Sequence, residues 1–169
     1  MLGVACYGKP QAAVQAQRGV VLLVLLLMLL LGAVAATAAA EVWATTRQRE
    51  LEQQLLFAGE QYRQAIRRYY ASAPRGQART YPARLEDLLE DNRFAQPVQH
   101  LRRLYPDPMT GQAEWRLVRQ HNRIVGVSSL SNEHPLKRAG FVSPHQDFEG
   151  KTSYRDWVFQ FTPAGSARR

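Results

Sequence analysis

The side chains that most often do chemistry are few in this chain and stand far apart. The four histidines, His100, His121, His134 and His145, lack the close pairing of a metal site. The single cysteine, Cys6, excludes a disulfide within the chain and a cysteine-rich metal site. We therefore expect surface histidines, no bound metal and no cofactor.

Acidic residues occur in adjacent pairs, Glu86 with Asp87 and Glu90 with Asp91, where a short helix is predicted. Negative side chains near the start of a helix are stabilised by its dipole, and nothing in this spacing marks a general acid and a general base. The sequence also has no Gly-x-Ser-x-Gly motif and no phosphate-binding glycine loop. We predict no catalytic residue and no enzyme activity.

The longest predicted element is a helix that begins in an apolar segment, and the rest of the chain is expected to pack on its second half. Residues 20–40 read VVLLVLLLMLLLGAVAATAAA and carry no charge. As a helix rising ~1.5 Å per residue, this segment spans ~30 Å, the thickness of a bilayer core. Residues 1–19 hold Lys9 and Arg18 but no acid, which favours a cytoplasmic amino terminus. We predict one transmembrane helix over residues 20–40.

The helical pattern continues beyond the apolar segment. Residues 41–73 are rich in Gln, Glu, Arg, Leu and Ala, and the proline at position 74 follows with Gly76. Apolar residues recur at spacings of three and four, which predicts an amphipathic half whose buried face packs against the head. This packing face consists of Leu51, Leu55, Ala58, Tyr62, Ala65, Ile66 and Tyr69.

Residues 74–113 predict a connecting segment with a short helix. Within residues 82–92, Leu85, Leu88 and Leu89 fall on one helical face that can pack against the long helix.

A turn follows, because proline, aspartate and glycine are dense in one stretch. The turn motif consists of Pro106, Asp107, Pro108 and Gly111.

Residues 114–169 predict a head of antiparallel strands. Residues 114–119 and 123–130 alternate and carry β-branched side chains, and residues 154–161 repeat aromatic ones. The predicted fold class is therefore α+β, with a long N-terminal helix packed on a small antiparallel sheet. Residues 130–151 show no clear pattern.

A basic leader ending in Arg18 and Gly19, followed by an apolar helix, resembles the class III signal of type IV pilins and pseudopilins. TYPARLEDLLED resembles the stretch that follows the long helix in the major pseudopilin of type II secretion. LYPDPMTGQAEWRLV resembles the proline-aspartate-proline turn and aromatic strand of that family. The resemblance extends over about residues 18–130.

The resemblance implies that a prepilin peptidase cuts between Gly19 and Val20 and methylates the new amino terminus at Val20. It also implies a single pass through a bacterial inner membrane, with the amino terminus cytoplasmic and the head periplasmic. The implied function is structural, as a subunit of a type II secretion filament. The implied partners are other pseudopilins, membrane lipid, an assembly platform and its ATPase, and an outer-membrane secretin.

Two positions depart from the family pattern. Pilins usually begin the mature helix with an aromatic residue and carry a glutamate at its fifth position, where this chain has Val20 and Val24. That glutamate pairs with a neighbouring subunit's terminal amine, so its loss favours a minor or specialised subunit. The acids of residues 131–153 are scattered, and we expect no calcium site there.

Two alternatives stay open at this point. The first is a type IV pilus or DNA-uptake subunit, although the net charge of +8 contains no long basic run and favours a solvated surface over a nucleic-acid site. The second is an exported periplasmic protein whose signal peptide is cut after Ala38 or Ala40, because the alanines supply a small-residue exit.

Overall fold

The computed structural model describes residues 12–163, and within the first helix it leaves the side chains of residues 12–18, 35 and 37–39 undescribed. The described chain contains the helix α1 (Ala12–Ala71), the strands β1 (Arg116–Gln120), β2 (Arg123–Ser128) and β3 (Phe159–Gln160), and three 3-10 helices. These are η1 (Glu86–Leu88), η2 (Gln146–Phe148) and η3 (Tyr154–Asp156). The predicted α+β class with a small antiparallel sheet is confirmed.

The chain divides into two units, Met1–Thr46 and Arg47–Arg169, and α1 contributes to both. The helix begins at Ala12, earlier than the predicted start at Val20, so part of the expected leader is helical. Residues 1–11 of that leader lie outside the described residues. At the other end α1 stops at Ala71, shortly before Pro74, which has no amide hydrogen to continue the helix.

In the unit Met1–Thr46, the apolar side chains from Val20 to Leu31 are all at least 45% exposed. In the part of the chain that the structure describes, no helix is long and apolar enough to cross a membrane. The membrane span predicted over residues 20–40 stays a prediction.

The unit Arg47–Arg169 is a head built around one face of α1. The structure buries Leu55, Tyr62 and Ile66 completely and leaves Tyr69 5% exposed, whereas Leu51 is only partly buried. Because these positions recur every three or four residues, they form one stripe against which the rest of the head packs. The packed partners from the rest of the head include Leu88, Leu101, Trp115, Ile124, Val127, Phe148, Tyr154, Trp157 and Phe159.

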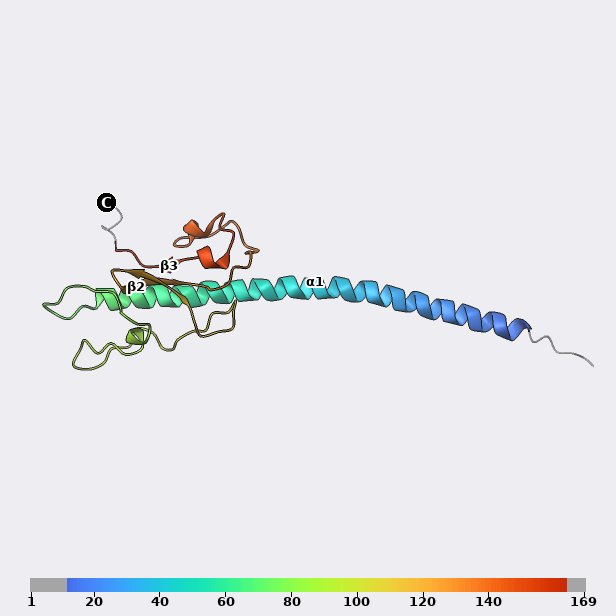
Figure 1. Ribbon diagram of the computed structural model, residues 1–169, viewed down its shortest axis with the longest axis horizontal. Helices are drawn as coiled ribbons and strands as arrows, with labels where there is room; N and C mark the ends of the chain where they lie inside the picture. Colours follow the sequence, from blue (N-terminus) through green and yellow to red (C-terminus); the bar gives the residue numbers. More distant parts are fainter. Residues whose placement is uncertain (1–11, 164–169) are drawn as a thin grey trace, which may run out of the picture. The chain divides into compact units, whose positions relative to one another are not determined.

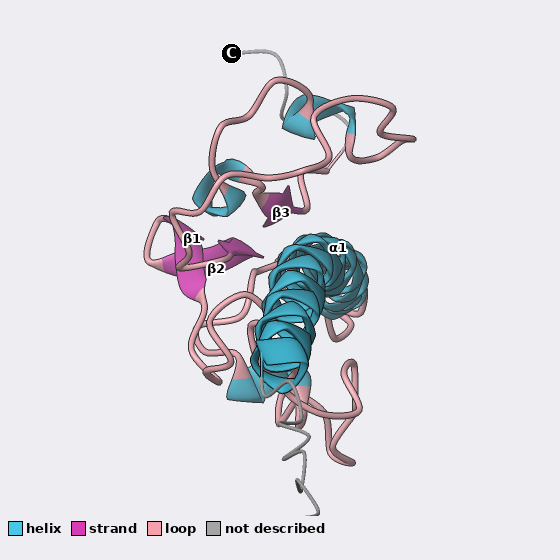
Figure 2. Ribbon diagram, turned by 90° about the vertical axis from the view of Figure 1, so that its right-hand side faces the viewer, coloured by secondary structure: helices cyan, strands magenta, loops and turns pink. Residues whose placement is uncertain are grey.

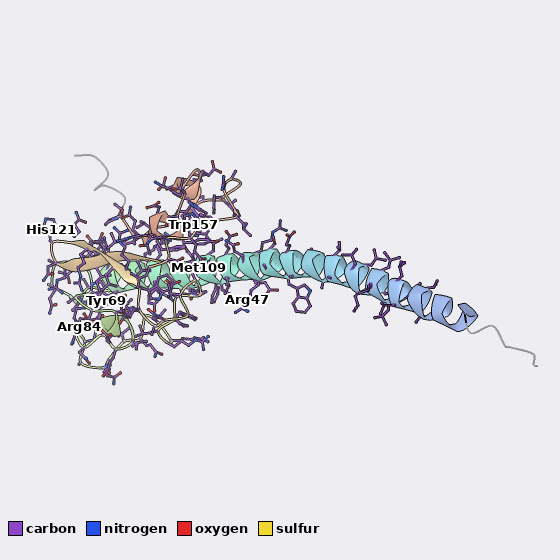
Figure 3. The ribbon with its side chains drawn as sticks, turned by 45° about the vertical axis from the view of Figure 1, so that its right-hand side comes forward. Arg47, Tyr69, Arg84, Met109, His121 and Trp157 are labelled. Atoms are coloured by element: carbon purple, nitrogen blue, oxygen red, sulfur yellow. The ribbon has the colours of Figure 1, made fainter. Side chains whose placement is uncertain are left out.

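The sheet has the order β1-β2-β3, and both pairings are antiparallel. It lies beside α1, and the two-residue turn between β1 and β2 has positive φ at His121 (48°) and Asn122 (59°) (Figure 2). Positive φ at both central residues is the geometry of the tight turns that match strand twist. Figure 3 shows His121 at the tip of this hairpin.

Two long irregular segments complete the head on different sides of the helix. The green segment that follows α1 contains η1, and the orange to red segment after β2 contains η2 and η3 (Figure 1). Each segment needs specific contacts to hold it on α1, because neither contains extended regular structure.

The short helix predicted over residues 82–92 is wrong, since only the single turn η1 forms. The amide of Asp91 donates to the carbonyl of Val98 (2.9 Å) in an isolated antiparallel bridge, which draws the chain out of a helical path. Leu88 is nevertheless fully buried, and Leu85 and Leu89 pack against the core.

The third strand is much shorter than residues 154–161. Tyr154–Asp156 instead form η3, where the Ser153 hydroxyl accepts from the amide of Arg155 (3.2 Å). A serine cap of this kind stabilises a helical turn and competes with extended structure.

Candidate functional site

The predicted processing segment lies within the exposed N-terminal part of α1. A Cβ at Gly19 would meet no atom within 4 Å, and Val20 is 63% exposed. Val24 is exposed as well, and the side chain of Arg18 lies outside the described residues. Packing within the described part of the chain therefore gives no reason for a glycine at position 19.

The turn motif folds around a fully buried aspartate. The amide of Gly111, which has φ +71°, donates to the carbonyl of Asp107 (2.8 Å), and the amide of Met109 donates to Oδ1 of Asp107 (3.0 Å). Pro106 is exposed and Pro108 is half-buried beside it. The motif forms a tight reversal around the Asp107 side chain.

The second oxygen of Asp107 connects this turn to the sheet. The hydroxyl of Ser129 donates to Oδ2 (2.7 Å), and so does the amide of Leu130 (3.1 Å). Both groups directly follow β2, so Asp107 fixes the point where the chain leaves the sheet.

Tyr62 joins the predicted packing face to the end of the connecting segment. Its hydroxyl donates to the carbonyl of Tyr105 (2.9 Å) and accepts from the amide of Tyr105 (2.9 Å). The indole of Trp115 donates to the same carbonyl (2.8 Å). Burial raises the pKa of Tyr62 to about 12, so the phenol stays neutral. Its two hydrogen bonds hold the backbone of Tyr105 against α1.

Glu52 is a buried acid on α1 that the sequence reasoning missed. It is 4% exposed, and its Oε1 accepts from the amides of Leu136 (2.6 Å) and Lys137 (3.2 Å). The hydroxyl of Tyr154 also donates to this oxygen (2.9 Å), and burial raises the pKa of Tyr154 to about 12. One carboxylate thus holds the segment between β2 and β3 against the helix.

A second buried acid holds the segment on the other side. Asp91 is 1% exposed, and the guanidinium of Arg93 donates to both of its oxygens (2.8 and 2.6 Å). Arg93 also donates to the carbonyl of Tyr69 (2.7 Å) and stacks on its ring at 3.6 Å. Burial alone would raise the pKa of Asp91, but the hydrogen bonds from Arg93 and His100 lower it below the usual value.

The expectation of four surface histidines is wrong for two of them. His100 is buried with Nε2 3.0 Å from Asp91, and His145 is half-buried, stacked on Phe148 and 3.4 Å from Glu60. Burial lowers the pKa of His145, although Glu60 opposes this shift. Their burial follows from contacts between distant segments, which spacing along the sequence does not reveal.

These polar groups are arranged to hold loops in place. Among residues 12–163, no group of three or more His, Cys, Asp or Glu residues could hold a metal ion. Glu52, Asp91 and Asp107 each accept several hydrogen bonds from fixed amides, hydroxyls or an arginine. An acid saturated in this way is suited to positioning backbone.

Comparison with known proteins yields no match to a family model, to a curated protein or to a solved structure. The pilin resemblance therefore rests on the residues of this chain alone.

Proposed function

We propose that this chain is a structural, pseudopilin-like subunit of a secretion filament, held in the inner membrane by the first part of α1. In this proposal a prepilin peptidase removes residues 1–19, and the periplasmic head packs beside those of partner subunits. The platform, the ATPase and the secretin implied by the resemblance supply the energy and the path. The chain itself performs no reaction.

The observation that carries the proposal is that the two parts of α1 have different surroundings. Its apolar side chains from Val20 to Leu31 are exposed, whereas its face from Leu55 to Tyr69 forms the core of the head. A large exposed apolar surface calls for lipid or protein cover. Residues 20–40 have the length of a membrane span. Helices in lipid associate through close packing, which suits a filament built on α1.

The polar groups of the head support a mechanical role. Glu52 attaches the segment between β2 and β3 to α1, and Arg93, held by Asp91, attaches the connecting segment to the same helix, so a force applied through α1 reaches both. Because Val24 stands where pilins carry a glutamate, we place the chain as a minor or specialised subunit.

Mass spectrometry of the mature amino terminus tests this proposal. Purification of the native chain from membranes should yield a terminus at Val20, with or without a methyl group. A terminus at Ala39 or Glu41 would overturn the proposal and favour an exported protein with a cleaved signal peptide.

A substitution pair sharpens the same test. Gly19→Leu places a bulky side chain beside the bond to be cut, so the full-length precursor should accumulate. Gly32→Leu is the matched control, because a Cβ at Gly32 likewise meets nothing within 4 Å. Equal processing of both variants would argue against cleavage after Gly19.

A further inference from the structure

A groove runs along the head between α1 and the connecting segment. It has a volume of about 530 Å³. The helix contributes Phe57, Gln61, Gln64 and Arg68, whose spacings of four, three and four place them on one face. Leu101, Arg102 and Tyr105 are among the residues that form the opposite wall.

One aromatic side chain that lines the groove, Phe57, is left largely uncovered by the head. Phe57 is 57% exposed although its ring packs edge-on against Tyr105, with centroids 5.8 Å apart. Exposed aromatic rings beside arginines are typical of the side chains that contribute most to protein–protein binding. The packing of the head itself accounts for only part of the Phe57 surface.

The charge of the groove has one sign. Arg68 and Arg102 are exposed, no ion pair is found for either within the described residues, and no acid lines the groove. Arg103 is a third cation close by, since its guanidinium stacks on the groove residue Tyr105 at 5.0 Å. An acidic ligand would therefore gain two unpaired guanidinium groups without meeting a like charge.

We propose that this groove docks an acidic segment of another protein, which places carboxylates on Arg68 and Arg102 and an apolar or aromatic side chain on Phe57. The amides of Gln61, Gln64 and Gln99 line the groove and can pair with the backbone of such a segment. A second copy of this chain is disfavoured, because it too carries a net charge of +8. This partner goes beyond the proposed filament role and does not depend on membrane insertion.

Single-stranded nucleic acid would use the groove differently. Such ligands need cations along a track of several nucleotides, together with aromatic rings for successive bases. Here the unpaired guanidinium groups lining the groove are two, and the exposed ring is one. A short acidic peptide segment needs only a few such contacts, and we therefore favour it over a nucleic acid.

The test is binding of defined polymers to the full chain in detergent micelles, measured by fluorescence anisotropy. The probe is a labelled random copolymer of glutamate and tyrosine, with polyglutamate and oligothymidylate as competitors. We expect the copolymer to bind more tightly than either competitor. Phe57→Ala should weaken its binding about tenfold, and Arg68→Gln combined with Arg102→Gln should do so by a similar factor.

Matched controls separate a site from general surface charge. Val142→Ala removes another exposed apolar side chain, 80% exposed, and Arg75→Gln with Arg138→Gln removes two exposed charges outside the groove. Both controls should bind the copolymer as the wild type does. Near-UV circular dichroism establishes that each variant is folded.

Three results would overturn the docking proposal. The first is that the copolymer does not bind, and the second is that groove and control variants weaken its binding equally. The third is that oligothymidylate binds as tightly as the copolymer and with the same dependence on Phe57, which would indicate a nucleic-acid groove. None of them bears on the terminus at Val20, so the docking and filament proposals fail separately.

Discussion

The ring of Phe159 lies directly on Gly59 of α1. A Cβ at position 59 would stand 2.4 Å from two ring carbons of Phe159, which is closer than such atoms approach. Phe159 belongs to β3, is 1% exposed, and pairs with Val127 of β2. The missing side chain at position 59 thus allows the sheet to sit against the helix.

Gly59→Ala should therefore destabilise the head even though alanine favours helix. Overpacking costs up to about 3 kcal/mol and the gain in helix propensity is about 1 kcal/mol, which leaves a net loss of about 2 kcal/mol. Urea unfolding of the full chain in detergent, followed by near-UV circular dichroism, measures this loss. Gly32→Ala, which meets nothing within 4 Å, should leave the transition of the head unchanged.

A second substitution tests the cause. If the clash with the ring is responsible, Phe159→Leu should cost less in the Gly59→Ala background than in the wild type. Additive losses would contradict a direct contact between the two residues.

The packing of this helix could be anticipated, because helical periodicity is a local property of the sequence. Leu55, Tyr62, Ile66 and Tyr69 were identified from their spacing, and the structure buries each of them. The role of Gly59 could not be anticipated, since it depends on where a strand one hundred residues later comes to lie, as the contact with Phe159 shows.

The buried polar groups could not be predicted from the sequence either, because their partners are far away along the chain. Glu52 stands three residues before Leu55, on the side of α1 that faces the head, but its partner Leu136 is 84 residues away along the chain, so helical spacing alone does not reveal what the carboxylate binds. Tyr154, which also binds Glu52, is predicted to lie in a strand but forms part of η3. Directly after η3, the ring of Trp157 stacks on Phe148, with centroids 5.5 Å apart. The Ser153 cap and the packing of these rings together favour η3 over the strand that the alternating pattern predicted.

Glu52→Ala should loosen the segment between β2 and β3. Two amides and the Tyr154 hydroxyl would lose a charged acceptor, which costs about 2–3 kcal/mol. Hydrogen exchange should accelerate at the amides of Leu136 and Lys137 by at least about tenfold. Glu50→Ala, an exposed acid on the same helix, should leave both amides protected, and unchanged exchange in Glu52→Ala would contradict the role of the carboxylate.

Asp91 should make the stability of the head depend on pH. Because its pKa is lowered from 3.8 in the folded state, the ionised carboxylate stabilises the fold above about pH 4, and this contribution disappears as the pH falls through the folded pKa. Asp91→Asn should cost about 2–3 kcal/mol at neutral pH, the value of hydrogen bonds to a charged group. Unfolding measured between neutral and acidic pH should show this cost shrinking below about pH 4. Exposed Glu90→Gln is the control, and a cost independent of pH would argue against an ionised Asp91.

The β1–β2 turn should accept a stabilising change. His121 and Asn122 both have positive φ, a conformation uncommon in residues other than glycine, and Asn-Gly is the preferred pair for such a turn. Replacing them together, as His121→Asn with Asn122→Gly, should stabilise the head by about 1 kcal/mol. The bond from Arg119 to the carbonyl of residue 122 uses the backbone and survives the change. Asn132→Gly, at an exposed position without positive φ, should give no gain because glycine there adds only freedom to the unfolded chain. A hairpin variant no more stable than the wild type in urea unfolding would mean that tertiary contacts of β1 and β2, and not the turn, determine the pairing.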